Sequence, residues 1–180
     1  MRRLGIITAL SMLLLALSAS VAFAAVPPGT YTPTSGSFNT ANAPGSSHLT
    51  SGTPSCTVNA NLSIDCSAYV LGGVGHTNAN VVLATTYKAD VTCSNKGVNP
   101  QNAVEAQGTT FTGSTSTPLT SSKNGQLSVP AQSASFSGTT SGLCPNGNWT
   151  ATFTNITLQS FSYTLTFAGF SSPYIEIKAP

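Results

Sequence analysis

Charged side chains are scarce in this sequence of 180 residues, which holds six basic and four acidic residues. Two of the basic residues, Arg2 and Arg3, lie at the N-terminus, so the rest of the chain balances four lysines against four acidic residues. A surface that binds nucleic acid needs clustered cations, because they displace the counterions of the phosphates. Four scattered lysines do not form such a cluster, and we expect no nucleic-acid partner.

The residues that carry most enzyme chemistry are equally few. The two histidines, His48 and His76, lie in a Ser/Thr-rich stretch and in a glycine-rich turn, and no G-x-S-x-G elbow accompanies them. A glycosidase would need two carboxylates that face each other across a cleft. No pairing pattern is visible among the four acidic residues, which are Asp65, Asp90, Glu105 and Glu176. We therefore predict a protein without catalytic activity, with a hydrolase as the remote alternative.

Motifs for cofactors and metals are missing as well. Residues 73–78 begin like a dinucleotide-binding loop, but Asn78 stands where the third glycine belongs and no helical pattern follows. A calcium loop needs acidic or amide side chains at alternate positions, and the sequence has no D-x-D or D-x-N run. We expect neither a cofactor nor a metal site.

The sequence lacks an apolar run of about 20 residues, the length that a membrane-spanning helix needs. Its longest apolar run, residues 4–17, directly follows Arg2 and Arg3 and is followed by small residues. This order is typical of a helical secretory signal peptide, and the tripeptide that ends at Ala24 fits the small-x-small cleavage rule. We predict a signal peptide over residues 1–24 and a mature chain that is secreted or associated with the cell wall, without a membrane anchor.

Only four cysteines are present, and none are spaced C-x-x-C as in common zinc sites. In an exported chain, four cysteines predict two disulfides, for which three pairings exist. We favour Cys56 with Cys66, because this spacing suits the two strands of a hairpin. The second pair is then Cys93 with Cys144, which would tie the middle of the chain to its C-terminal part.

Helical periodicity is absent from the mature chain, and alternation of apolar and polar residues takes its place. In residues 81–93 the odd positions are mostly apolar, while Lys88 and Asp90 fall on the other face. This pattern predicts a long half-buried strand. Similar runs occur at residues 62–66, 149–153, 161–167 and 174–178, and weaker ones at 104–112 and 126–136. Glycine- and asparagine-rich turns separate them, as hairpins require.

These strands predict one all-β domain over residues 55–180. We expect a single immunoglobulin-like β-sandwich of about seven to nine antiparallel strands, with a closed barrel as the alternative. Residues 25–54 are rich in proline, glycine, serine and threonine, which predicts an extended, flexible spacer. Composition alone leaves open whether this spacer adds an edge strand around Tyr31 or Phe38.

Aromatic side chains give the one positive indication of a ligand. An aromatic platform for sugar rings could be built from Trp149, Phe153, Phe161, Tyr163 and Phe167. Their alternate spacing fits core positions better, and we favour that interpretation. The candidate binding residues are Trp149, Tyr163, Tyr87 and Tyr69.

Three N-x-S/T sequons occur, at Asn61, Asn148 and Asn155. A sequon marks a site where an exported protein can accept a glycan. Such triplets arise often by chance in a chain rich in serine, threonine and asparagine, so the sequence leaves glycosylation open.

The segment from Cys144 to Phe153 reads C-P-N-G-N-W-T-A-T-F. It resembles a C-P-N-x-N-W-T-A-T pattern of short exported proteins of actinobacteria and related bacteria. Residues 71–79 and 92–95 are similar to the same group, so the resemblance covers about residues 56–167. It implies a β domain with a disulfide, and it implies no catalytic residues, since that group has no assigned activity.

Taken together, the sequence predicts a secreted or cell-envelope structural or interaction protein. Its neutral, hydroxyl-rich faces suit contact with a cell-wall polymer, a polysaccharide or another surface protein. A carbohydrate-binding module or small-ligand carrier is the alternative, and exposed aromatic rings would favour it. The sequence leaves the partner and the oligomeric state open.

Overall fold

The computed structural model describes residues 25–95, 104–139 and 141–179, and the predicted signal peptide lies outside them. These residues form antiparallel strands and one short 3-10 helix, η1 (Thr40–Asn42). The predicted all-β class is confirmed. Over the same residues, no helix has the length and apolar character needed to cross a membrane.

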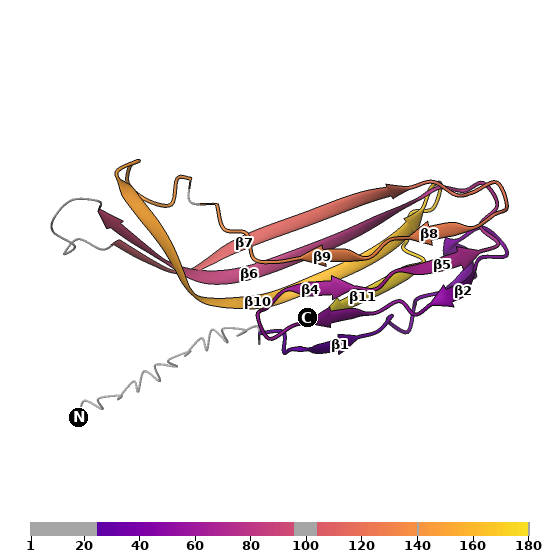
Figure 1. Ribbon diagram of the computed structural model, residues 1–180, viewed down its shortest axis with the longest axis horizontal. Coiled ribbons are helices and arrows are strands. Elements are labelled where there is room, and N and C mark those ends of the chain that lie inside the picture. Colours follow the sequence, from indigo (N-terminus) through magenta and orange to yellow (C-terminus); the bar gives the residue numbers. More distant parts are fainter. Residues whose placement is uncertain (1–24, 96–103, 140, 180) are drawn as a thin grey trace, which may run out of the picture.

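The largest sheet has the strand order β11-β10-β6-β7. Its strands are β6 (Ala79–Asn95), β7 (Val104–Leu119), β10 (Trp149–Phe167) and β11 (Ile175–Ala179). In β6 the odd positions from Ala79 to Cys93 are buried and the even positions are more exposed, as the alternation predicts. The three long strands of this sheet run along the length of the molecule (Figure 1).

Two smaller sheets face it. One has the order β1-β3-β4-β9, with β1 (Gly29–Tyr31), β3 (Cys56–Val58), β4 (Ile64–Cys66) and β9 (Gln132–Ala134). The other has the order β2-β5-β8, with β2 (His48–Gly52), β5 (Tyr69–Gly72) and β8 (Leu127–Val129). The chain passes directly from β2 to β3, from β4 to β5 and from β8 to β9, so the two small sheets continue each other as one broken layer.

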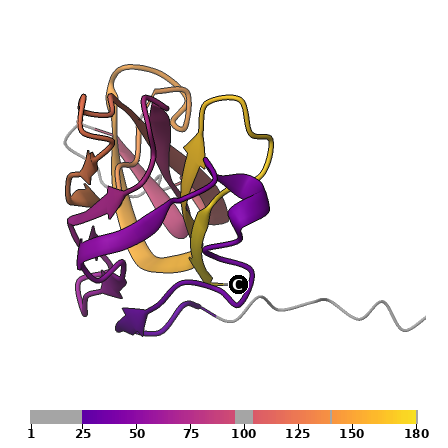
Figure 2. The same ribbon diagram turned by 90° about the vertical axis from the view of Figure 1, so that its right-hand side faces the viewer.

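The two layers face each other in the end-on view of Figure 2. The buried side chains between them form one hydrophobic core. Its largest fully buried side chains include Tyr87, Tyr163, Tyr174 and Phe167. Tyr69 of β5 and Tyr163 of β10 meet in this core, where their hydroxyl oxygens lie 3.0 Å apart. The core therefore contains polar links between the layers as well as apolar packing.

Residues 25–54 belong to the folded unit, which corrects the flexible spacer expected from their composition. Val26 and Ala43 are buried in the common core, and the Val26 N–H donates to the Leu158 carbonyl at 2.8 Å. β1 and β2 both lie in this segment. A few buried side chains and backbone hydrogen bonds hold a stretch whose composition resembles that of a linker.

The two aromatic residues of this segment differ. Tyr31 lies in β1, and its ring packs edge-on against Phe161 with ring centroids 5.2 Å apart. Phe38 lies in a turn at a φ of 62°, a left-handed conformation that is rare for a bulky residue. Its exposed ring contacts Tyr174 edge-on. An edge strand thus forms at Tyr31 and not at Phe38.

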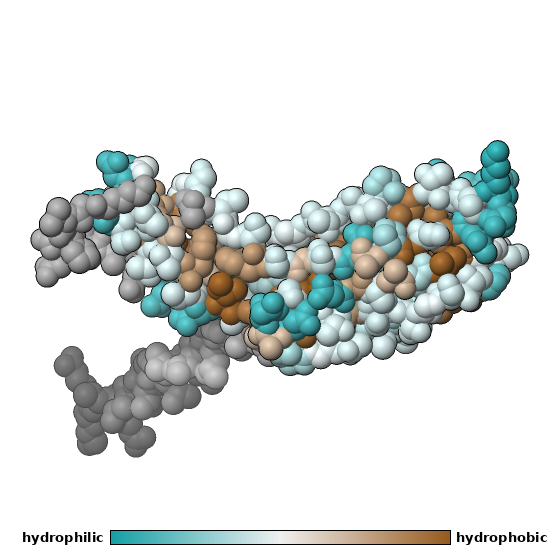
Figure 3. Space-filling model, in the orientation of Figure 1, coloured by the Kyte–Doolittle hydropathy of each residue, from teal (hydrophilic) through white to brown (hydrophobic). Residues whose placement is uncertain are grey.

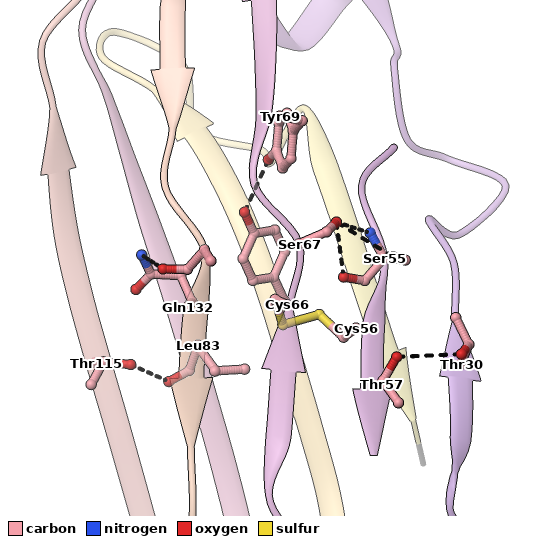
Figure 4. Close-up of a disulfide and its surroundings, with 12 residues drawn as sticks. Thr30, Ser55, Cys56, Thr57, Cys66, Ser67, Tyr69, Leu83, Thr115 and Gln132 are labelled. Atoms are coloured by element: carbon pink, nitrogen blue, oxygen red, sulfur yellow. Dashed lines mark hydrogen bonds between the residues drawn. A yellow bond between two sulfur atoms is a disulfide. The ribbon is translucent and has the colours of Figure 1, made fainter. Parts of the chain in front are cut away.

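Both predicted disulfides form, Cys56–Cys66 and Cys93–Cys144. The first joins directly opposite residues of β3 and β4, with Tyr69 close by (Figure 4). The second ties β6 to the loop that precedes β10. Two closed disulfides indicate an oxidising environment.

The three long strands extend beyond the smaller sheets as a curved projection, which we call the arm (Figure 1). The arm consists of residues 89–95 of β6, 104–109 of β7 and 149–155 of β10. The Cys93–Cys144 disulfide lies within it. The molecule is therefore a layered body with one elongated end.

Candidate functional site

The structure separates the four aromatic residues predicted as binding candidates. Tyr69, Tyr87 and Tyr163 are at most 3% exposed and belong to the core. Trp149 is partly exposed on the arm. Phe161 is also buried, so the five rings considered as a sugar platform do not share one surface. Only Trp149 keeps the position that a binding role requires.

A group of four aromatic rings, two of them among those considered for binding, joins the arm to the body. Tyr87, Phe111, Phe136 and Phe153 pack edge to face, with ring centroids 5.3–5.6 Å apart. Gly138 lies against this group, because an added Cβ there would lie 2.6 Å from the ring of Phe153. Such edge-to-face pairs stabilise a core beyond their buried area. Phe153 therefore has a structural role at the base of the arm.

Trp149 lines a half-open pocket of about 610 Å³ on the arm, together with Ser141, Asn146 and Thr150. A turn positions the main chain at Trp149, since the backbone N–H of Trp149 donates to the Asn146 carbonyl at 3.1 Å. Cys144 lies in the pocket wall, so the disulfide to β6 fixes the same loop. An indole ring beside hydroxyl and amide groups can stack on and hydrogen-bond a sugar.

Asp90 organises the bend of the arm. Its carboxylate accepts from the Gly108 N–H and from the Asn155 side chain, each at 2.8 Å. Both partners lie where the strand register shifts, and both have positive φ angles, 64° and 49°. β-bulges of this kind increase strand bending and twist. One carboxylate on β6 thus stabilises irregularities in both of its neighbouring strands.

These two hydrogen bonds also affect the charge state of Asp90. The bond from Asn155 and the bond from the Gly108 N–H lower the pKa of the Asp90 carboxyl below its ordinary value. Hydrogen bonds to the charged form favour that form. The carboxylate therefore stays ionised down to lower pH than an unbonded aspartate would.

A shallow groove lies between β7 and residues 133–137. It has a volume of about 260 Å³, and its lining includes Thr115, Ser133, Ser135 and Ser137. Thr117 near its end donates to the side-chain oxygen of Gln132 at 3.0 Å. The groove marks the side of the molecule where the edge of the large sheet faces the edge of a smaller one.

The titratable residues considered for catalysis have separate structural surroundings. Asp65 accepts from the Asn59 side chain at 2.7 Å, and Glu176 pairs with Lys178 at 3.1 Å. A ring nitrogen of His48 lies 2.7 Å from the Ser46 carbonyl. Among the residues with assigned positions, no group of three His, Cys, Asp or Glu side chains is arranged to hold a metal ion.

The three sequon asparagines are exposed. The Asn61 side chain accepts from the N–H and the hydroxyl of Ser63, at 3.1 and 2.8 Å. Asn155 is engaged with Asp90 at the bulge. Their exposure is compatible with glycan attachment, and the structure does not decide the question that the sequence left open.

Sequence reasoning missed the role of Asp90 and the group of rings at the base of the arm. It placed Asp90 correctly on the outer face, but nothing in a single strand shows a bulge in its neighbours. Phe111 and Phe136 lie in the two weaker strand patterns, where alternation is less regular. Residues 106–119 contain no charged residue, which the sequence shows directly. This matters only because β7 lies at the edge of its sheet, and a single sequence does not show that position.

Comparison with known proteins gives no relative: no family model, no curated protein and no solved structure matches this chain. The resemblance to short exported bacterial proteins stays a prediction. Function has to be argued from the surfaces described above.

Proposed function

We propose that this protein is exported and acts outside the cell through contacts, as a structural or interaction component of the envelope or its surroundings, without catalysis. One observation carries the proposal: an elongated, disulfide-bonded body has few exposed charged residues and many exposed serine and threonine residues. Much of the face in Figure 3 is correspondingly pale, which marks intermediate hydropathy. Of its few charged side chains, Asp90 stabilises the bulges and Glu176 pairs with Lys178.

We also propose that the body is an immunoglobulin-like module. The order β11-β10-β6 matches the G-F-C order of such domains, with β7 in the place of an additional strand beside C. The order of the broken layer, from β2/β3 through β4/β5 to β8/β9, matches A-B-E. On this assignment Tyr69 and Tyr163 link strands B and F, which antibody domains join by a disulfide.

Fractionation of the source cells into medium, wall, membrane and cytoplasm tests the proposal. We expect the protein in the medium or wall, with Ala25 as its first residue and with all four cysteines oxidised. Crosslinking in the same fractions would identify what lies beside it. Recovery from the cytoplasm with an intact N-terminus and free thiols would refute export.

Carbohydrate binding at the Trp149 pocket is a second candidate function. It is favoured by the partly exposed indole beside Ser141, Asn146 and Thr150. The test is retention of the mature chain on insoluble cellulose, chitin and peptidoglycan. We expect Trp149→Ala to abolish retention and Phe38→Ala, which removes an exposed ring elsewhere, to preserve it. If none of the three insoluble glycans retains the unaltered chain, the pocket is not a binding site for them.

A further inference from the structure

β7 is a long strand that forms one edge of the large sheet. Its 16 residues correspond to about 50 Å of extended backbone. On one side β7 pairs with β6 along almost its whole length. Over the described residues, no strand pairs with its other side. Every second residue of β7 therefore directs its backbone N–H and C=O groups away from β6, to the side where no strand pairs with them.

The other outermost strands are protected in the usual ways. β1, β8 and β9 have only three residues each, and β2 has five. β11 has five residues and carries Glu176 and Lys178. Natural sheets keep edge strands short or charged because an open edge is a template for another chain. β7 is the exception among the edges that the structure describes.

Apart from Glu105 near its start, β7 carries no charged side chain that would oppose pairing. Residues 106–119 contain no charged residue, and proline appears only at position 118, next to the last residue. The solvent-facing positions are small and polar, and all are exposed: Thr110, Thr112, Ser114 and Ser116. β7 runs along the upper side of the molecule in Figure 1, and in the same orientation much of that side is pale in Figure 3, which marks intermediate hydropathy. By contrast, the neighbouring strand β6, which is paired on both sides, carries Lys88 and Asp90.

We propose that two copies of this chain join through β7, edge to edge and antiparallel, about a two-fold axis. The two four-stranded sheets would then form one continuous sheet of eight strands. This inference rests on the proposed function as a contact protein and names the partner as a second copy.

Charge and symmetry favour a second copy as the occupant. An antiparallel pair of identical strands is self-complementary, so the same edge serves both partners. With the axis near Gly113, Thr112 lies opposite Ser114 of the other copy, and uncharged residues face each other along residues 107–119. Cross-strand pairs of threonine and serine are favourable, whereas like charges opposite each other are not. The mature chain has no net formal charge, so two copies do not repel each other.

The test measures the mass of the mature chain in solution over a range of concentrations by sedimentation. We expect a dimer that dissociates on dilution. The variant Thr112→Lys/Ser114→Lys places lysines opposite lysines at the axis, and we expect its dissociation constant to rise at least tenfold. The control Ser171→Lys/Ser172→Lys adds the same charge in the exposed loop before β11 and should dimerise like the unaltered chain.

Hydrogen exchange gives a second readout that needs no variant. In the unaltered chain we expect alternate amides of residues 107–117 to become protected as concentration rises. A chain that stays monomeric at all concentrations, or a dimer that both lysine variants form equally well, would overturn the inference. Either result would leave the proposal of export intact, because fractionation and disulfide state decide that separately.

Discussion

The hydroxyl oxygens of Tyr69 and Tyr163 lie 3.0 Å apart in the core and join β5 of one layer to β10 of the other. Both side chains are at most 3% exposed, so neither hydroxyl has water as an alternative partner. A buried polar group without a hydrogen bond loses its solvation without compensation. Each tyrosine hydroxyl therefore depends on the other.

This dependence predicts strong coupling between the two positions. We expect Tyr69→Phe or Tyr163→Phe alone to lower the free energy of unfolding by about 1–3 kcal/mol, because each leaves one buried hydroxyl unpaired. The double Phe variant should be close to the unaltered protein, since it removes both partners. Denaturant unfolding of all four proteins measures the coupling. Additive losses in the double variant would show that the hydroxyls do not depend on each other.

The same pair predicts sensitivity to alkali. Burial raises the pKa of Tyr69 and that of Tyr163 above the ordinary value of 10, so both hydroxyls stay neutral in the folded protein. In the unfolded chain they ionise near pH 10, and stability is lost as pH rises from there toward the folded-state pKa values. We expect the melting temperature to fall between about pH 8 and about pH 11, and to fall less in the double Phe variant. Equal slopes would contradict this assignment.

Asp90 predicts the opposite dependence, at acid pH. Hydrogen bonds from Asn155 and Gly108 lower the pKa of its carboxyl, so their stabilisation is present above the ordinary value of 3.8. It is lost as pH falls through the lowered folded-state pKa. We expect Asp90→Ala to lower the melting temperature at neutral pH, with a difference that shrinks in acid. Thr92→Ala, at the next outer position of β6, should show a difference that does not change with pH.

The two disulfides should contribute unequally. They close loops of 10 and 51 residues in sequence separation, and chain entropy assigns them about 2.7 and about 4 kcal/mol. We expect Cys93→Ala/Cys144→Ala to destabilise more than Cys56→Ala/Cys66→Ala. Trp149 is the only tryptophan and reports on the arm. In the Cys93→Ala/Cys144→Ala variant, the Trp149 fluorescence should change at a lower denaturant concentration than the far-UV circular dichroism signal of the body. If the two transitions coincide, the arm does not unfold independently.

Much of the fold follows from local patterns. The odd positions of β6 alternate so regularly that one layer of the core can be predicted from this strand. Both disulfide pairings are confirmed, and the short Cys56–Cys66 spacing fits the hairpin of β3 and β4. Such features are predictable because neighbours in sequence determine them.

Features that depend on distant residues could not be predicted. The Val26 N–H is bound by the Leu158 carbonyl, which is 132 positions away in the sequence. Local composition does not show such a contact, and on composition alone residues 25–54 resemble a spacer. Trp149 and Tyr163 share one strand and one spacing pattern, yet one is partly exposed on the arm and the other is in the core. The difference arises because the smaller sheets cover only part of the long strands.

Two register shifts in β10 change which residues of that strand face inward, one between Leu158 and Ser160 and one between Thr154 and Thr157. The inward residues are odd-numbered at Phe161 and Tyr163. Between the two shifts the even-numbered Leu158 faces inward, and from Phe153 back to Trp149 the inward residues are odd-numbered again. Each shift moves the strand out of phase by one residue, and the second restores the original phase. A deletion of Gln159 would therefore displace every inward side chain from Trp149 to Leu158, whereas the loss of one residue from a turn would leave the strands in phase.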